Sequence, residues 1–230
     1  MDIGLTLKSL QRCKGVKLCP KTIGQFGQSL PDFHQQLLSE CDGLSVYHGY
    51  LRILGVSGAC GHSLKEWNDR EFWKFAWGEG VDDFLCFGMN AFGDQFAYNL
   101  SDLGAGQAAP VFVLDGMTME PEVAYGCFSE FFIREIVEGA SNPYDSVLRD
   151  ARDYIGPLSG KELLAYAPPL LLSGDEDPQF CVKLEARTVM VANGDVFTQV
   201  EQLPEDAEIL GVTPYIDNSG RGRLGLDVLS

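Results

Sequence analysis

Short apolar runs of strand length occupy the middle of the chain, between residues 82 and 136. The runs lie at about 84–87, 92–98 and 111–114, and clusters of glycine, asparagine and aspartate separate them. Asp115-Gly116 closes the third run with a further turn signal. Apolar runs bounded by turn residues are typical of strands joined by tight connections. The pattern therefore predicts a small antiparallel meander.

Amphipathic helices are expected on both sides of this meander. One covers 29–43, with Ser29 as its N-cap and Gly43 in the left-handed position after its end. The other begins at Ser129, and its apolar residues recur on one face as far as Val137.

Three more segments between residues 46 and 166 have readable patterns. Residues 46–56 predict a hairpin with its turn near His48, and 63–77 carry the apolar stripe of a helix. Residues 146–166 have a helical pattern that Gly156-Pro157 interrupts, so two short helices are expected there.

The last third of the chain alternates like strands. An extended segment is expected after Pro168, followed by strands over 181–193 and 195–201 with Asn193-Gly194-Asp195 as the hairpin turn. Two further strands are expected between 207 and the C-terminus. The overall fold class is α+β, with a mostly antiparallel sheet and a C-terminal β-rich extension. The expected units are an N-terminal lead-in over 1–27, an α+β domain over 28–140, a helical connector over 141–167 and a β-rich subdomain over 168–230.

The chain carries a large excess of negative charge, with 33 acidic and 17 basic residues in 230 and a formal net charge of -16. A chain this acidic is repelled by nucleic acid and by anionic membrane surfaces, and it attracts a basic protein partner. The alternative is that the charge serves only solubility. Since 45% of the residues are hydrophobic, a packed core is expected.

The N-terminal sequence has no apolar core of signal-peptide length, and no run reaches membrane-spanning length, so a cytoplasmic location is expected. The seven cysteines have irregular spacing, and in a reducing compartment they are expected to be mostly buried free thiols.

No catalytic, metal-binding or cofactor-binding motif stands out. His48, Cys60 and His62 match no zinc-ligand spacing, and the surroundings of Ser57 lack the second glycine of a nucleophile elbow because residue 59 is alanine. The protein is therefore predicted not to be an enzyme and to need no cofactor. A pocket holding Cys60 and His62, or two buried carboxylates, would reopen the enzyme alternative.

Adjacent acidic residues are the candidate partner contacts. Most such residues are simply solvated, but those on turns fit recognition of a basic surface. The candidates are Asp82, Asp83, Asp94, Asp175, Glu176 and Asp177.

The order of these segments resembles the SUKH superfamily, the Smi/Knr-like domain. The resemblance rests on Leu30-Pro31 with Asp42-Gly43, then Phe87-Gly88, Gly93-Asp94, the aromatic strand 96–98, Pro110-Val111 and the helix from Ser129 to Phe132, and it covers roughly 28–138. It implies a twisted sheet flanked by helices and a binding module without catalytic residues. The C-terminal part lies beyond the family pattern.

Bacterial members of this family often resemble immunity proteins that bind and occlude a toxin, frequently a nuclease. The expected partner is therefore a basic cognate toxin protein, with no role for nucleic acid or membrane. The alternative is a regulatory scaffold of the eukaryotic Smi/Knr type.

Overall fold

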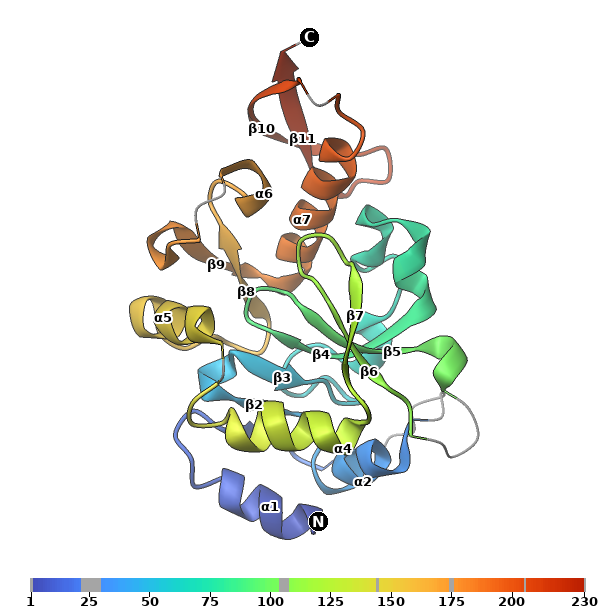
Figure 1. Ribbon diagram of the computed structural model, residues 1–230, viewed down its shortest axis with the longest axis vertical. Coiled ribbons are helices and arrows are strands. Elements are labelled where there is room, and N and C mark those ends of the chain that lie inside the picture. The colour runs from blue at the N-terminus through green and yellow to red at the C-terminus, as the bar shows by residue number, and fades with distance from the viewer. Residues whose placement is uncertain are drawn as a thin grey trace.

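A seven-stranded antiparallel sheet forms the centre of the computed structural model (Figure 1), which describes residues 2–21, 30–103, 108–143, 145–173, 176–204 and 206–229. Its strands follow chain order, and each pairs with the next. They are β1 (Lys17–Leu18), β2 (Leu44–Val46), β3 (Leu51–Ile53), β4 (Phe84–Asn90), β5 (Gln95–Asn99), β6 (Val111–Leu114) and β7 (Pro121–Tyr125). The sheet is twisted, so that β7 lies at a steep angle to β2 and β3. The α+β class and the central meander are confirmed.

Alternate residues of β5 face two helical layers, because successive side chains of a strand point to opposite faces. On one face, the ring of Phe96 lies 4.7 Å from that of Phe131. On the other face, Gln95 accepts a hydrogen bond from Trp67 Nε1 at 2.7 Å and lies 3.7 Å from Met190 Sδ. The central sheet is therefore covered on both sides.

The first layer contains α1 (Ile3–Leu10), α2 (Asp32–Glu40) and α4 (Phe128–Phe131), which a π-helical turn continues over Phe132–Glu138. These helices lie together below the sheet in Figure 1. The predicted helices before and after the meander are thus present, but Ser29 lies outside the described residues and α4 begins one residue before Ser129. The lead-in contains α1, which buries Ile3, Leu7 and Leu10.

The second layer contains α3 (Leu64–Trp67), which is much shorter than the helix predicted over 63–77. Asn68 ends it: its Nδ2 donates to the carbonyls of Leu64 and Cys86, and its Oδ1 accepts from Cys86 N. Asparagine side chains compete in this way with the helical backbone. The chain then turns and forms a 3-10 helix at Lys74–Ala76.

The C-terminal third adds two small sheets and more helix than expected. Its elements are α5 (Ser146–Ile155), β8 (Glu162–Tyr166), α6 (Leu170–Ser173), β9 (Cys181–Glu185), α7 (Ala186–Val200), β10 (Glu208–Ile216) and β11 (Gly222–Leu229). β8 pairs with β9, and β10 with β11. The prediction of a second short helix before Tyr166 was wrong, since β8 lies there, and the segment expected to be extended contains α6.

The predicted hairpin at Asn193-Gly194-Asp195 is also wrong, because all three residues lie within α7. Gly194 does not make a turn there. A Cβ at this position would lie 2.8 Å from Trp77 Nε1 and 2.9 Å from the carbonyl oxygen of Ala76. The glycine therefore permits the close approach of α7 to the segment that follows α3.

The expectation of free thiols is wrong for two cysteines. Cys19 and Cys60 form a disulfide that joins the N-terminal segment to the loop before α3. Cys13, Cys41, Cys86, Cys127 and Cys181 are free.

Candidate partner-binding surface

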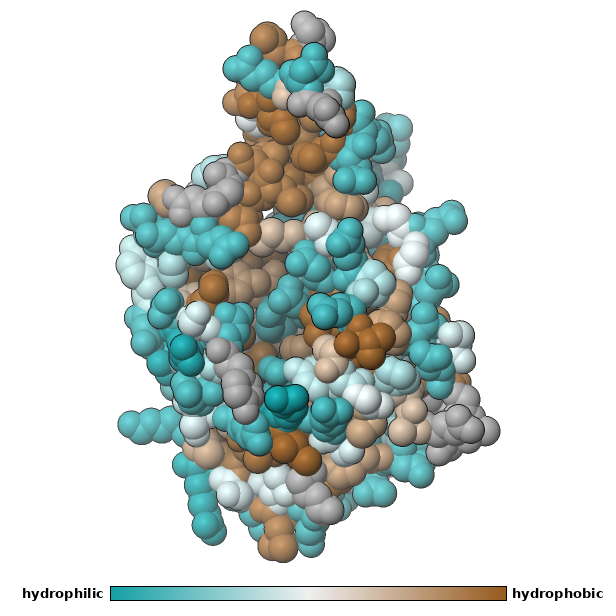
Figure 2. Space-filling model, in the orientation of Figure 1, coloured by the Kyte–Doolittle hydropathy of each residue, from teal (hydrophilic) through white to brown (hydrophobic). Residues whose placement is uncertain are grey.

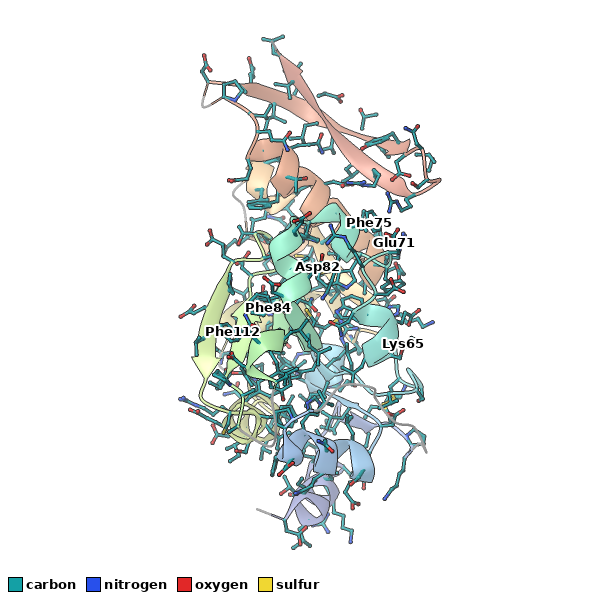
Figure 3. All side chains as sticks on the ribbon, turned by 90° about the vertical axis from the view of Figure 1, so that its right-hand side faces the viewer. Lys65, Glu71, Phe75, Asp82, Phe84 and Phe112 are labelled. Carbon is teal, nitrogen blue, oxygen red and sulfur yellow. A yellow bond between two sulfur atoms is a disulfide. The ribbon has the colours of Figure 1, made fainter. Side chains whose placement is uncertain are left out.

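The structure places the first predicted contact pair on the 3-10 helix Glu79–Asp83. Asp82 forms an ion pair with Arg70, and Asp83 is exposed. Figure 3 shows Asp82 on the side of the molecule that also carries Lys65. Both carboxylates are therefore at the surface, but Asp82 already has a cationic partner.

Asp94 has a structural role instead. One carboxylate oxygen accepts from Gly116 N at 2.7 Å and the other from Asn90 Nδ2 at 2.6 Å, which ties the β4–β5 turn to the β6–β7 turn. Burial raises the pKa of Asp94, and the hydrogen bonds from Gly116 and Asn90 partly oppose that rise. Both carboxylate oxygens of Asp94 therefore accept hydrogen bonds from within the fold.

The second acidic group lies elsewhere. Asp175 is outside the described residues, Glu176 is exposed, and Asp177 accepts a hydrogen bond from Gln179 N at 2.9 Å at the start of a 3-10 turn. Asp177 lines an open hollow together with three residues of α5, which are Asp150, Asp153 and Tyr154, and with Pro178. The convergence of these residues was not predicted from the sequence.

The two acidic groups do not form one contact surface. In Figure 1, α5 lies at the left edge of the molecule, whereas the teal segment that precedes β4 lies at the right. A single flat partner cannot cover both at once. The predicted acidic contacts therefore lie on two separate parts of the surface.

A small cavity does hold Cys60 and His62, the pair named for an enzyme. Its volume is about 20 Å³, enough for roughly one water molecule. Cys60 is in the disulfide, so its sulfur is not a thiol nucleophile. The ring of His62 lies between Glu66 and Glu185, with nitrogen–oxygen distances of 3.2 and 3.5 Å. Within the described ranges, no group of three His, Cys, Asp or Glu side chains could hold a metal ion.

A groove lies between α7 and the β10–β11 hairpin, and it was not predicted from the sequence. Its volume is about 440 Å³, within the usual range for binding sites. One face of α7 forms its floor, and the ends of β10 and β11 nearest their turn form its wall. The lining is mainly apolar and includes Leu184, Val191, Ala192, Pro214, Tyr215, Ile216 and Leu224.

Two polar side chains of α7 hold the wall of this groove in place. Asp195 accepts from Leu224 N at 2.8 Å and pairs with the guanidinium of Arg223. Gln199 donates to the Leu224 carbonyl at 2.8 Å and accepts from Leu226 N at 2.9 Å. These bonds satisfy backbone groups on the edge of β11 in place of a neighbouring strand. The groove is thus built into the fold.

Arginines gather at the hairpin end of the groove, around the ring of Phe75. The guanidinium carbons of Arg187, Arg221 and Arg223 lie 5.7, 4.0 and 5.2 Å from the ring centroid. Figure 3 shows Phe75 and Glu71 beside the end of the hairpin, and Arg221 forms an ion pair with Glu71 at 3.0 Å. Three arginines and the carboxylates that pair with two of them therefore meet at this corner of the groove.

Apolar side chains are also exposed around the groove. Figure 2 shows hydrophobic residues on the hairpin and continuing below it toward α6 and β9. Ile216 is 70% exposed and Leu210 is 62% exposed. The exposed fraction is smaller, but still large, for Leu171, Phe180, Val182, Leu184 and Tyr215. Contiguous exposed apolar areas are typical of the interaction sites of soluble proteins.

No family model and no curated protein matches the chain. Among solved structures, the chain is similar to the crystal structure of Atu4351 from Agrobacterium tumefaciens, with 11% sequence identity and a TM-score of 0.46. The alignment covers 93% of this chain and 94% of that one. In the described part of the chain, none of the helices has the length and apolar character needed to cross a membrane.

Proposed function

We propose that this protein is an immunity-type binding protein, which neutralises a cognate toxin by binding and occluding it. The observation that carries the proposal is the apolar groove between α7 and the β10–β11 hairpin, with exposed apolar side chains around it. Protein interfaces combine an apolar centre with a polar rim, and this face offers both. The toxin as partner is supported by the resemblance of residues 28–138 to SUKH domains.

Charge supports the same proposal. The net charge of -16 attracts a basic partner over long range and speeds the encounter, while the groove supplies short-range contact area. In this division of roles, the separated acidic groups steer the partner, and the groove holds it. The hollow of Asp150, Asp153 and Asp177 contributes to steering.

The experiment is co-expression with the product of the adjacent gene in a host that this product inhibits. The wild-type protein is expected to restore growth, and a variant with Tyr215→Ser and Ile216→Ser is expected to restore it much less. Leu5→Ser is the matched control, because Leu5 is 65% exposed and lies on α1 at the other end of the molecule. A neighbouring product that binds the protein without inhibiting growth would instead favour a regulatory scaffold.

A further inference from the structure

Arg187 is held in a fixed orientation at the groove. Its Nε donates to the Phe72 carbonyl at 2.6 Å, and its guanidinium lies 5.8 and 5.7 Å from the ring centroids of Phe72 and Phe75. Arg187 also lines the groove itself. An arginine fork fixed in this way loses little freedom when it binds a further group.

The other two arginines of this corner already have carboxylate partners. Arg223 pairs with Asp195 and lies 3.6 Å from Asp217, and Arg221 pairs with Asp217 at 2.9 Å and with Glu71. Arg187 differs from them: no carboxylate of the described residues forms an ion pair with it. The guanidinium of Arg187 is therefore a positive charge at the groove without a carboxylate partner among the described residues.

The pairing of these three arginines restricts which partner side chains the groove can bind. A lysine or arginine of a partner would meet the unpaired positive charge of Arg187 and be repelled. A wholly apolar segment would take the guanidinium out of water without a partner, which is costly. A carboxylate satisfies the arginine fork with two parallel hydrogen bonds, and apolar neighbours of that carboxylate suit the remaining lining.

We propose that the groove binds a partner segment in which an Asp or Glu side chain pairs with Arg187 between apolar residues. The apolar residues contact Val191 on the floor and Tyr215 and Ile216 on the wall. This inference rests on the proposed function, since it names the part of the protein partner that the groove recognises. It also separates two kinds of contact: the acidic surface attracts basic regions of the partner, whereas the groove requires an acidic residue.

The test uses three short peptides with acetylated and amidated ends: Leu-Glu-Phe-Leu, Leu-Gln-Phe-Leu and Leu-Lys-Phe-Leu. Binding to the full-length protein is followed by amide chemical shifts. The glutamate peptide is expected to shift amides of α7 and the hairpin and to bind about tenfold more tightly than the glutamine peptide, with the lysine peptide weakest. Equal affinities, tighter binding of the lysine peptide, or no binding of any peptide would overturn the inference.

Arg187 variants assign the preference to this side chain. Arg187→Gln is expected to abolish the difference between the glutamate and glutamine peptides, and Arg187→Lys to keep part of it. Arg134→Gln is the control, because Arg134 lies in the π-helical turn after α4 and is 56% exposed. A preference that survives Arg187→Gln overturns the inference.

The same variants separate this inference from the proposed function. If the neighbouring gene product binds wild type and Arg187→Gln equally well, the carboxylate inference fails and the proposed function stands. If it does not bind wild type at all, the proposed function fails, and the peptides still decide the chemistry of the groove. Sedimentation of the protein alone shows whether a second copy fills the groove, and a dimer that Arg187→Gln dissociates would overturn the assignment to a different partner.

Discussion

The carboxylate of Asp195 on α7 binds the guanidinium of Arg223 on β11. Asp195 Oδ1 lies 2.7 Å from Arg223 Nε, and Asp195 is 1% exposed. The side-chain hydrogen bond to Asp195 raises the pKa of Arg223. Because it connects the hairpin to the helix, the pair maintains the shape of the groove between them.

Removing one member of this pair is expected to destabilise the protein. Asp195→Asn removes the buried carboxylate that lies nearest to Arg223, and the free energy of unfolding is expected to fall by about 3 kcal/mol. Urea denaturation measures the change. Asp227→Asn on β11 is the control, because Asp227 is exposed and accepts a surface hydrogen bond from Thr213, so a change of about 0.5 kcal/mol or less is expected. Equal stability of Asp195→Asn and wild type would show that the pair does not anchor the hairpin.

Gly194 is expected to tolerate no side chain. Gly194→Ala places a Cβ within 2.9 Å of Trp77 and Ala76 atoms and is expected to cost about 1–3 kcal/mol of unfolding free energy. Gly80→Ala is the matched control, since a Cβ at Gly80 has no atom within 4 Å. The two variants are compared by thermal and urea unfolding, and a neutral Gly194→Ala would contradict the close packing of α7.

Gly194 also shows why the C-terminal third was harder to predict than the meander. Asn-Gly-Asp between two apolar runs is a hairpin signal locally, but here the glycine is selected by contact with Trp77, which lies far away in the sequence. The meander was predictable because its turn residues, including Gly93 with a φ of 94°, act locally. The groove could not be predicted, because it exists only once α7 is recognised as a helix and packed under the hairpin.

The predicted contact residues also show that local sequence does not reveal contacts between distant segments. Sequence reasoning identified Asp82, Asp83 and Asp177 as surface acids, and the structure places them at the surface. It treated Asp94 as equivalent, but Asp94 is committed to Gly116 and Asn90 by contacts between separate turns. An acidic residue on a turn has the same local signature whether it is solvated or cross-links the fold.

His34 is expected to make stability fall with acidity. It is stacked on Phe128 with a centroid distance of 4.1 Å, and burial lowers its pKa from 6.5 to about 3. Between these two values the unfolded state binds a proton that the folded state does not, so stability is full above pH 6.5 and decreases toward pH 3. The contribution of this residue to the slope is at most about 1.4 kcal/mol per pH unit.

The variant His34→Phe isolates this contribution from that of the carboxylates. It is expected to lose about 1 kcal/mol at pH 7, because the nitrogen 3.1 Å from the Tyr98 hydroxyl is removed. Its stability is also expected to fall less steeply than that of wild type from pH 6.5 downward, as measured by urea unfolding over a pH series. Parallel pH curves would show that His34 does not titrate in this way.

The Cys19–Cys60 disulfide is expected to contribute substantially to stability. It closes a loop with a sequence separation of 41 residues, for which loop entropy corresponds to about 4 kcal/mol. The variant with Cys19→Ser and Cys60→Ser is expected to unfold at lower urea concentration, and reduced wild type is expected to match it. If reduction changes nothing, the two thiols are not bonded in the protein.

Partner binding through the groove is tested most directly by calorimetric titration with the product of the adjacent gene at low and high salt. Wild type and the Leu5→Ser control are expected to bind equally tightly, with affinity that decreases as salt screens the charge of -16. The variant with Tyr215→Ser and Ile216→Ser is expected to bind at least about tenfold more weakly at both salt concentrations, because it removes apolar contact area and no charge. Undiminished binding by this variant would contradict the assignment of the partner to the groove.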